Sequence, residues 1–236
     1  MSTLVLAELR MLLRNRLVAA CAILIPLAFG AFLVFTRPGG GGGAGVIATL
    51  QVMIMAAMGV YVTATTTLAA RRQTLMLKRL RSGSMSDVSI VVGLLVPILL
   101  VSVVQIAIIL TVLSITAAAP ANAALLIVAI LLTEVMFAGF ALATAGVTNS
   151  PEHAQVTTLP LFFGTVGVAY WVIFTGTAEL TWLKRALPGG GIAELIGAAW
   201  SGTEVTQLAA LILPSVGWAV IALYVARTMF RWEPRA

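Results

Sequence analysis

The residues of this chain that could do chemistry are few, and most lie in or beside long apolar runs. Glu134 is the one ionisable side chain well inside such a run. An isolated carboxylate is costly to bury there, so it must face a cavity or a partner, or carry a proton. One interpretation of Glu134 is contact with a cationic ligand. The other is a hydrogen bond between helices, for instance to Gln105.

The other candidate groups do not combine into a catalytic or metal site. Cys21 is the only cysteine, so one chain forms neither a disulfide nor a cysteine metal site. His153, the only histidine, follows Pro151 and Glu152 in a polar break, where a solvated or capping role fits better than a proton relay. These widely separated groups predict no catalytic, cofactor-binding or metal-binding residues.

A basic segment with interspersed leucines, from Ala70 to Ser86, is the most informative part of the sequence. It predicts a short helix that exposes Leu75, Met76 and Leu80 among positive charges. Apolar anchors within a charged rim suit docking into a groove on another protein. The alternative is an ordinary positive-inside loop, and the residues alone favour neither interpretation.

Membrane-spanning helices must position these groups. The chain is 61% hydrophobic and 9% charged, with a mean hydropathy of +1.09, which lies outside the range of soluble domains. A helix needs about 20 apolar residues to cross a bilayer. The net charge of +6 could suggest nucleic acid, but the basic residues flank apolar runs without interleaved aromatics. We therefore expect a lipid bilayer and no nucleic acid as partner.

The apolar runs predict an all-α integral membrane protein with one transmembrane domain over residues 1–236. The six expected spans cover about 17–36, 45–70, 88–117, 123–147, 157–175 and 207–226.

Two further helical segments are expected outside these spans. Residues 3–16 predict an amphipathic interfacial helix, with an extension of the first span as the alternative. Residues 176–206 contain an apolar stretch too short to span. They predict an external segment with one or two re-entrant helices before span six, with Trp182 and Trp200 at the level of the lipid head groups.

Basic residues set the orientation, because six spans place both ends of the chain on one side. The other side would carry only Arg37, Lys184 and Arg185. We therefore expect a multi-pass protein of the cell membrane with both termini in the cytoplasm. The residues that would share the cytoplasmic side are Arg10, Arg14, Arg16, Arg71, Arg72, Lys78, Arg79, Arg81, Arg227, Arg231 and Arg235.

The segment after the second predicted span also carries a resemblance to a known family. The chain resembles the membrane subunits of type-2 ATP-binding cassette exporters, of the daunorubicin-resistance permease kind. These proteins share an amphipathic amino-terminal helix and an external helical hairpin introduced by Leu-Pro, as in Leu187-Pro188. Gln73 and Gly83-Ser84 depart from the usual family pattern. The matching loop residues are Arg72, Thr74, Leu75, Lys78, Arg79, Leu80, Arg81, Ser82, Met85 and Ser86.

The resemblance implies a permease that moves a drug-like or amphiphilic natural product out of the cell. It implies two membrane chains, identical or paralogous, and two separate ATPase subunits that supply ATP and Mg. Glu134 becomes a candidate for the export pathway. The chain has no G-x-x-x-x-G-K-S/T motif, so we expect no ATP hydrolysis in it. The implied coupling helix between spans two and three comprises Arg72, Thr74, Leu75, Met76, Lys78, Arg79, Leu80 and Arg81.

An ATP-independent transporter or an immunity protein is the competing interpretation. Secondary transporters usually carry inverted repeats, broken helices and several intramembrane charges. This sequence has one such charge, Glu134, and no evident repeat. Copurification of an ATPase subunit distinguishes the two interpretations.

Overall fold

The computed structural model describes residues 5–10, 16–36, 43–83, 85–202, 208–230 and 232, with the backbone of 16–22. Every regular element in these ranges is a helix, and the first covers residues 5–10. The expected all-helical fold is confirmed for this part of the chain. The other helices are α2 (Arg16–Phe35), α3 (Gly43–Ala56), η1 (Ala57–Val62), α4 (Thr63–Gln73), α5 (Met76–Arg81), α6 (Asp87–Thr116), α7 (Ala123–Val147), α8 (Pro151–Thr157), α9 (Leu159–Thr175), α10 (Thr181–Ala186), α11 (Gly190–Ser201) and α12 (Leu208–Met229).

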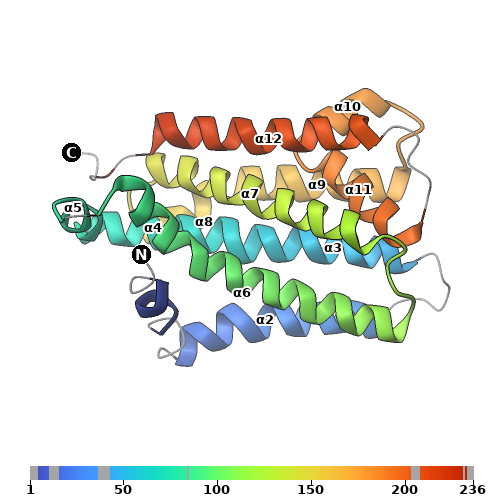
Figure 1. The fold of residues 1–236 in the computed structure, drawn as a ribbon, viewed down its shortest axis with the longest axis horizontal. Coiled ribbons are helices and arrows are strands. Elements are labelled where there is room, and N and C mark those ends of the chain that lie inside the picture. Colours follow the sequence, from blue (N-terminus) through green and yellow to red (C-terminus); the bar gives the residue numbers. More distant parts are fainter. Residues whose placement is uncertain are drawn as a thin grey trace.

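Among the described residues, five helical segments are long and apolar enough to cross a bilayer. Two of them join shorter elements, since α3, η1 and α4 are continuous and α8 leads into α9. The long helices run side by side along the bundle (Figure 1). The chain is therefore a multi-pass helical membrane protein. The five segments are Gly43–Gln73, Asp87–Thr116, Ala123–Val147, Pro151–Thr175 and Leu208–Met229.

The start of α8 corrects one predicted boundary. The side chain of Ser150 accepts a hydrogen bond from the backbone N–H of His153 at 3.3 Å, and Pro151 occupies the first turn. Proline and an acidic residue such as Glu152 are favourable in a first helical turn. The helix therefore begins at Pro151, within residues interpreted as a polar break and before the expected start of the span at about residue 157.

Helices α7 and α12 pack at very short range through small residues. A Cβ atom added at Gly139 would lie 2.7 Å from the Cβ of Ala222, and one added at Gly146 would collide with the Met229 carbonyl. Lipid tails are as apolar as leucine, so close van der Waals contact rather than water exclusion holds spanning helices together. Both glycines are required for this contact.

Helix α11 is too short to span and is buried among α3, α7, α9 and α12. The backbone N–H groups of Ala121 and Asn122 donate to the carbonyls of Trp200 and Ala199, at 3.2 and 2.9 Å, at its carboxyl end. Irregular backbone is tolerated at membrane depth only when protein covers it. Trp200 is 4% exposed, so its expected place among the lipid head groups is wrong.

A buried lysine stabilises the turn between α9 and α10. Lys184 Nζ donates to Thr175 Oγ1 at 2.8 Å and to the Gly176 carbonyl at 2.6 Å, and it lies 5.0 Å from the centroid of the Trp171 ring. A cation at the carboxyl end of a helix satisfies free carbonyls and complements the helix dipole. A Cβ at Gly190 would collide with the Lys184 carbonyl, so glycine permits this close approach.

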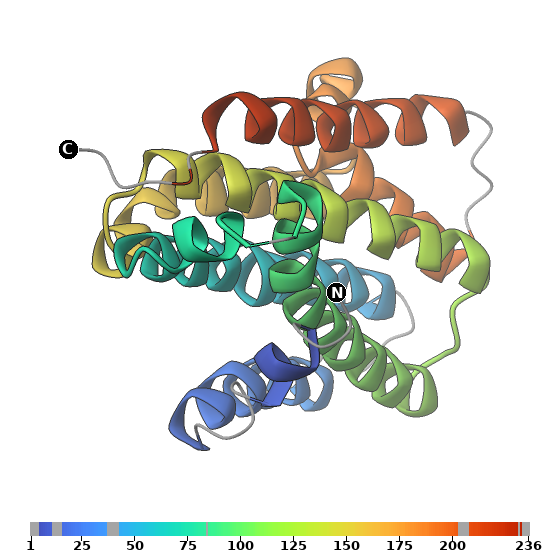
Figure 2. The same ribbon diagram turned by 60° about the vertical axis from the view of Figure 1, so that its left-hand side comes forward.

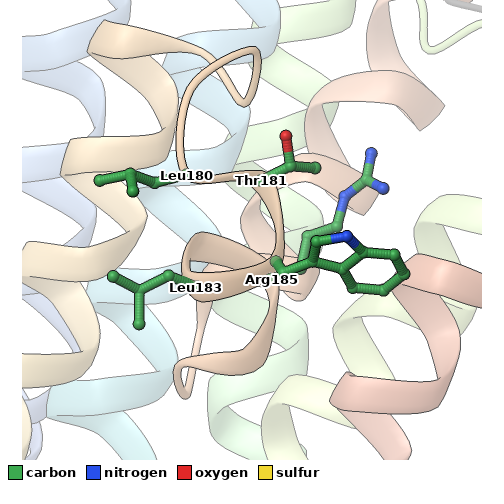
Figure 3. Close-up of a pocket in the computed structure, with 5 residues that line it drawn as sticks. Leu180, Thr181, Leu183 and Arg185 are labelled. Carbon is green, nitrogen blue, oxygen red and sulfur yellow. The ribbon is translucent and has the colours of Figure 1, made fainter.

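An ion pair holds α10 against α11. Arg185 donates from Nε and Nη2 to the two carboxylate oxygens of Glu194, at 2.8 and 2.6 Å. This bidentate pair raises the pKa of Arg185 through its hydrogen bonds with Glu194. Leu180 and Leu183 project together from the outer side of α10, whereas Arg185 points another way (Figure 3). Trp182 is 77% exposed, as its predicted head-group position requires.

Helix α2 lies at the edge of the bundle beside α3 and α6 (Figure 2). Two buried side-chain amides attach it. Gln51 Nε2 donates to the Gly30 carbonyl at 3.0 Å, and Gln105 Nε2 donates to the Ile23 carbonyl at 3.4 Å. Pro26 disturbs the backbone hydrogen bonds of the preceding turn. The Gln105 amide therefore supplies a donor where the proline weakens the helix.

Adding one methyl group at Gly139 should destabilise the protein by about 1–3 kcal/mol, because Gly139→Ala overpacks the contact between α7 and α12. In an open helical position the same substitution is neutral or stabilising. Gly164→Ala is the matched control, since no described atom lies within 4 Å of its added Cβ. Thermal unfolding in one detergent compares the two variants. Equal stability would contradict the packing requirement.

Candidate functional site

Helix α5 follows a sharp turn at the end of α4. Leu75, which precedes α5, has φ 57°, a left-handed conformation that leucine rarely adopts, and its side chain is 42% exposed. Leu77 is 1% exposed and anchors α5 on the bundle. Met76 and Leu80 are half-buried, and Leu80 packs against the core. The expected exposure is therefore confirmed for Leu75 and wrong for the other two, because a six-residue helix lying on the bundle must bury one face.

The outer side of α5 and the turn before it form a basic surface. Thr74, Lys78, Arg79 and Arg81 are exposed beside Leu75. We call these five residues the α5 surface. An exposed leucine surrounded by cationic side chains has the composition of a small docking surface, with an apolar anchor and a polar rim.

The predicted coupling residue Arg72 lies elsewhere. Its side chain is 2% exposed, and Nη1 donates to the Gly146 carbonyl at 3.3 Å in the last turn of α7. A cation at a helix carboxyl end complements the helix dipole. Arg72 thus joins α4 to α7 inside the bundle and does not belong to the α5 surface.

Arg71 connects three segments near the α5 surface. Its guanidinium forms an ion pair with Glu8 on helix 5–10, and its Nη1 lies 2.8 Å from the Met76 sulfur of α5. Burial raises the pKa of the Glu8 carboxyl above its usual value, and the charge of Arg71 opposes that rise. The cost of desolvating the two charges thus offsets much of the attraction between Glu8 and Arg71. The ion pair fixes the position of helix 5–10 more than it raises the stability of the protein. Glu8 was not predicted as a functional residue; its one sequence signal is that it is the single acidic residue in the expected helix 3–16.

Arg81 joins α5 to the next helix. Its Nε lies 3.2 Å from Asp87 Oδ1 at the start of α6, and its guanidinium carbon lies 5.3 Å from the centroid of the Trp232 ring. Both charged side chains are about half-exposed, so the ion pair contributes little stability. Through these contacts α5 is attached to α4, α6 and the end of the chain beyond α12.

Glu134 forms a separate polar centre inside the bundle. The side chain is 3% exposed, and Ser102 Oγ of α6 donates to its Oε1 at 2.8 Å. Glu134 Oε2 has no hydrogen-bond partner among the described residues. The expected hydrogen bond between helices is therefore present, but its donor is Ser102 instead of the suggested Gln105, which donates to α2.

The π-helix η1 lies beside this centre. A Cβ added at Gly59 would lie 3.3 Å from Ser102 Oγ, which places the middle of η1 against the donor to Glu134. The wider turn of a π-helix changes which backbone N–H groups reach its carbonyls. The Thr63 hydroxyl donates to one of these carbonyls, that of Met58, at 3.0 Å. Short π-helices inside α-helices often mark functional sites. No hydrophobic periodicity in the sequence predicted this π-helix.

This centre offers a hydrogen-bonded carboxyl and an adjacent irregular helix, which suit binding of a cation or a donor group. Across the described residues no three metal-ligating side chains cluster. His153 is exposed in the first turn of α8, in line with its predicted solvated role. The side chain of Cys21 lies outside the described residues.

Comparison with known proteins gives no assignment. No protein-family model matches the chain. No curated protein matches it either.

Reversing the charge at Glu8 should loosen helix 5–10, because Glu8→Lys places two cations in contact. We expect the amides of residues 5–10 to exchange hydrogen about fivefold faster, as for loss of about 1 kcal/mol. The exchanged pair, Glu8→Arg with Arg71→Glu, should restore slow exchange. Glu152→Lys, at an exposed position, is the control. Unchanged exchange in Glu8→Lys would refute the docking contact.

Proposed function

We propose that the chain is the membrane subunit of an ATP-binding cassette exporter, driven by a separate ATPase that contacts the α5 surface. The observation that carries the proposal is the construction of α5. Leu77 fixes it to the bundle, while Leu75 projects outward among exposed cations. A rigidly attached helix can pass a displacement to the spans, which a flexible loop of the same charge could not.

The proposed subunit has six spans, with α2 as the first. Helix α2 has 20 residues, the usual length of a spanning helix, and its described side chains from Ile23 to Phe35 are apolar. Helix 5–10, α5 and the end of α12 lie at one end of the bundle, opposite α10 and α11 (Figure 1). We assign the α5 end to the cytoplasm from its basic residues. Of the residues that predicted this orientation, Arg14, Arg37, Arg231 and Arg235 lie outside the described residues.

The proposed assembly contains two membrane chains, as a homodimer or with a paralogue, and two ATPase subunits that bind ATP and Mg. The sequence supports a separate ATPase because it lacks a phosphate-binding loop. We infer a drug-like or amphiphilic natural product as cargo, moved out of the cell across the plasma membrane. An apolar bundle with the buried Glu134 carboxyl in one of its long helices suits an amphiphilic molecule that carries a cationic or hydrogen-bond-donating group.

Replacing the exposed leucine by aspartate should uncouple the complex. Leu75→Asp puts a charge into the proposed cleft of the ATPase without touching the bundle, so the variant should insert normally. We expect loss of the copurifying ATPase, or ATP hydrolysis that no longer responds to substrate. Losing one apolar anchor at such an interface costs about 2 kcal/mol or more, roughly a 30-fold loss of affinity.

Leu180→Asp is the matched control for this experiment. Leu180 is also an exposed leucine with a positive φ, 54°, before a six-residue helix, but it lies at the opposite end of the bundle. The Leu180→Asp variant should still copurify with the ATPase. If Leu75→Asp copurifies and exports like the wild type, the coupling assignment fails. If no ATPase copurifies even with the wild type under native expression, an ATP-independent transporter or immunity protein is favoured.

Removing the charge of Glu134 should impair transport more than assembly. Glu134→Gln retains the shape and accepts the Ser102 hydrogen bond through its amide oxygen. A lost charged contact of about 1.5 kcal/mol lowers export and substrate-stimulated ATP hydrolysis about tenfold. Ser215→Ala is a control for general packing effects, because the buried Ser215 hydroxyl donates to the Leu211 carbonyl of its own helix, at 2.7 Å. If the Glu134→Gln variant exports like the wild type, the Glu134 carboxyl has a packing role only.

A further inference from the structure

A groove of about 260 Å³ opens at the α5 end of the bundle, next to the α5 surface, since its lining residues Asp87 and Trp232 both contact Arg81. Its walls come from α6 and α12, with Leu142 of α7 between them. The groove begins where two candidate spans end, at Asp87 and Arg227. It therefore lies where the hydrocarbon layer meets the lipid head groups.

The interior and the mouth of the groove differ in chemistry. The side chains that line its walls between α6, α7 and α12 are mostly aliphatic: Val88, Val91, Val92, Leu142, Leu223 and Ala226. Arg227 and Trp232 stand at the mouth, the residue types that anchor proteins at a membrane interface. An apolar slot with a cationic and aromatic mouth matches an acyl chain joined to a polar head group.

The charges at the mouth favour an anionic head group. Asp87 is neutralised by Arg81 at 3.2 Å. Arg227 makes no hydrogen bond or ion pair with any other described residue and is exposed. The two arginines and one aspartate leave one net positive charge at the mouth, and the exposed cations of the α5 surface lie at the same end of the bundle.

We propose that this groove binds one anionic phospholipid from the leaflet on the side of α5, with its acyl chain between α6 and α12 and its phosphate at Arg227. The surrounding lipid tails already lie in hydrocarbon, so a tail gains little by entering the groove. Selection among lipids therefore comes from the head group, where each basic residue near the surface strengthens anionic binding. The proposal does not depend on the ATPase.

Native mass spectrometry of the full-length protein with equal amounts of phosphatidylglycerol and phosphatidylcholine tests the site. We expect one phosphatidylglycerol retained in preference to phosphatidylcholine. Arg227→Gln should weaken phosphatidylglycerol binding about fivefold and leave phosphatidylcholine unchanged. Arg10→Gln removes an equal charge from an exposed position of helix 5–10, outside the groove lining, and should retain the lipid preference of the wild type. No head-group preference, or equal losses in both variants, would overturn the proposal in favour of diffuse attraction.

Filling the groove provides a second test. Val91→Trp should abolish retention of both lipids while keeping the helical circular dichroism of the wild type. Should that variant fail to fold, the wild type can be labelled with a phosphatidylglycerol that carries a diazirine on its acyl chain. We expect labels within residues 87–92 and 223–230. Labels spread evenly over the outward faces of α9 and α12, or crosslinks between two copies through the groove, would refute the lipid site.

Discussion

The need to satisfy every backbone polar group without water shapes the whole bundle. Long helices meet this need internally, and the irregular segments meet it by being covered with protein. Helix α11 illustrates the constraint, because its carboxyl end leaves carbonyls without partners inside the helix. The N–H groups of Ala121 and Asn122 reach two of them, and four neighbouring helices exclude lipid. Lys184 satisfies the carboxyl end of α9 in the same way, by donating to Thr175 Oγ1 and to the Gly176 carbonyl. Its positive charge is stabilised there by the helix dipole and not by a carboxylate.

The same absence of water changes what holds the helices together. Apolar side chains gain little by leaving lipid for protein, so association depends on close contact and polar bonds. The Gly139 and Gly146 contacts of α7 bring its backbone against α12, and α2 is attached through the amides of Gln51 and Gln105. Close glycine contacts and amide hydrogen bonds thus hold different parts of the bundle together. Helices α7 and α12 form a tight pair, whereas α2 lies at the edge and is attached at fewer places (Figure 2).

Hydropathy predicted long apolar helices at five of the six expected spans, because a bilayer imposes a length that local sequence must meet. The span at Ala123–Val147 was predicted to the residue, since Asn122 caps its start. Features that depend on distant partners were missed. Trp200 looked like an interfacial residue but is buried by α11 packing, and Glu8 acquires its role only when Arg71 is beside it. The π-helical turn of η1 likewise has no hydrophobic periodicity in the sequence that could predict it. The coupling role of α5, the orientation and the cargo stay predictions.

One continuous helix relates the two candidate sites. Gly43–Gln73 ends at the turn into α5, and its π-helical segment lies against Ser102, the donor to Glu134. Arg71 and Arg72, in its last turn, attach it to helix 5–10 and to α7. Under the proposed function, a displacement of α5 passes to α4, and the π-segment is where an irregular turn favours bending of the helix. Under the proposed function, the bend would alter the contact between η1 and Ser102 and so change the surroundings of the Glu134 carboxyl. The helix Gly43–Gln73 then links ATPase docking at α5 to the Glu134 carboxyl of α7, because its end adjoins α5 and its π-helical segment lies against Ser102, the donor to Glu134.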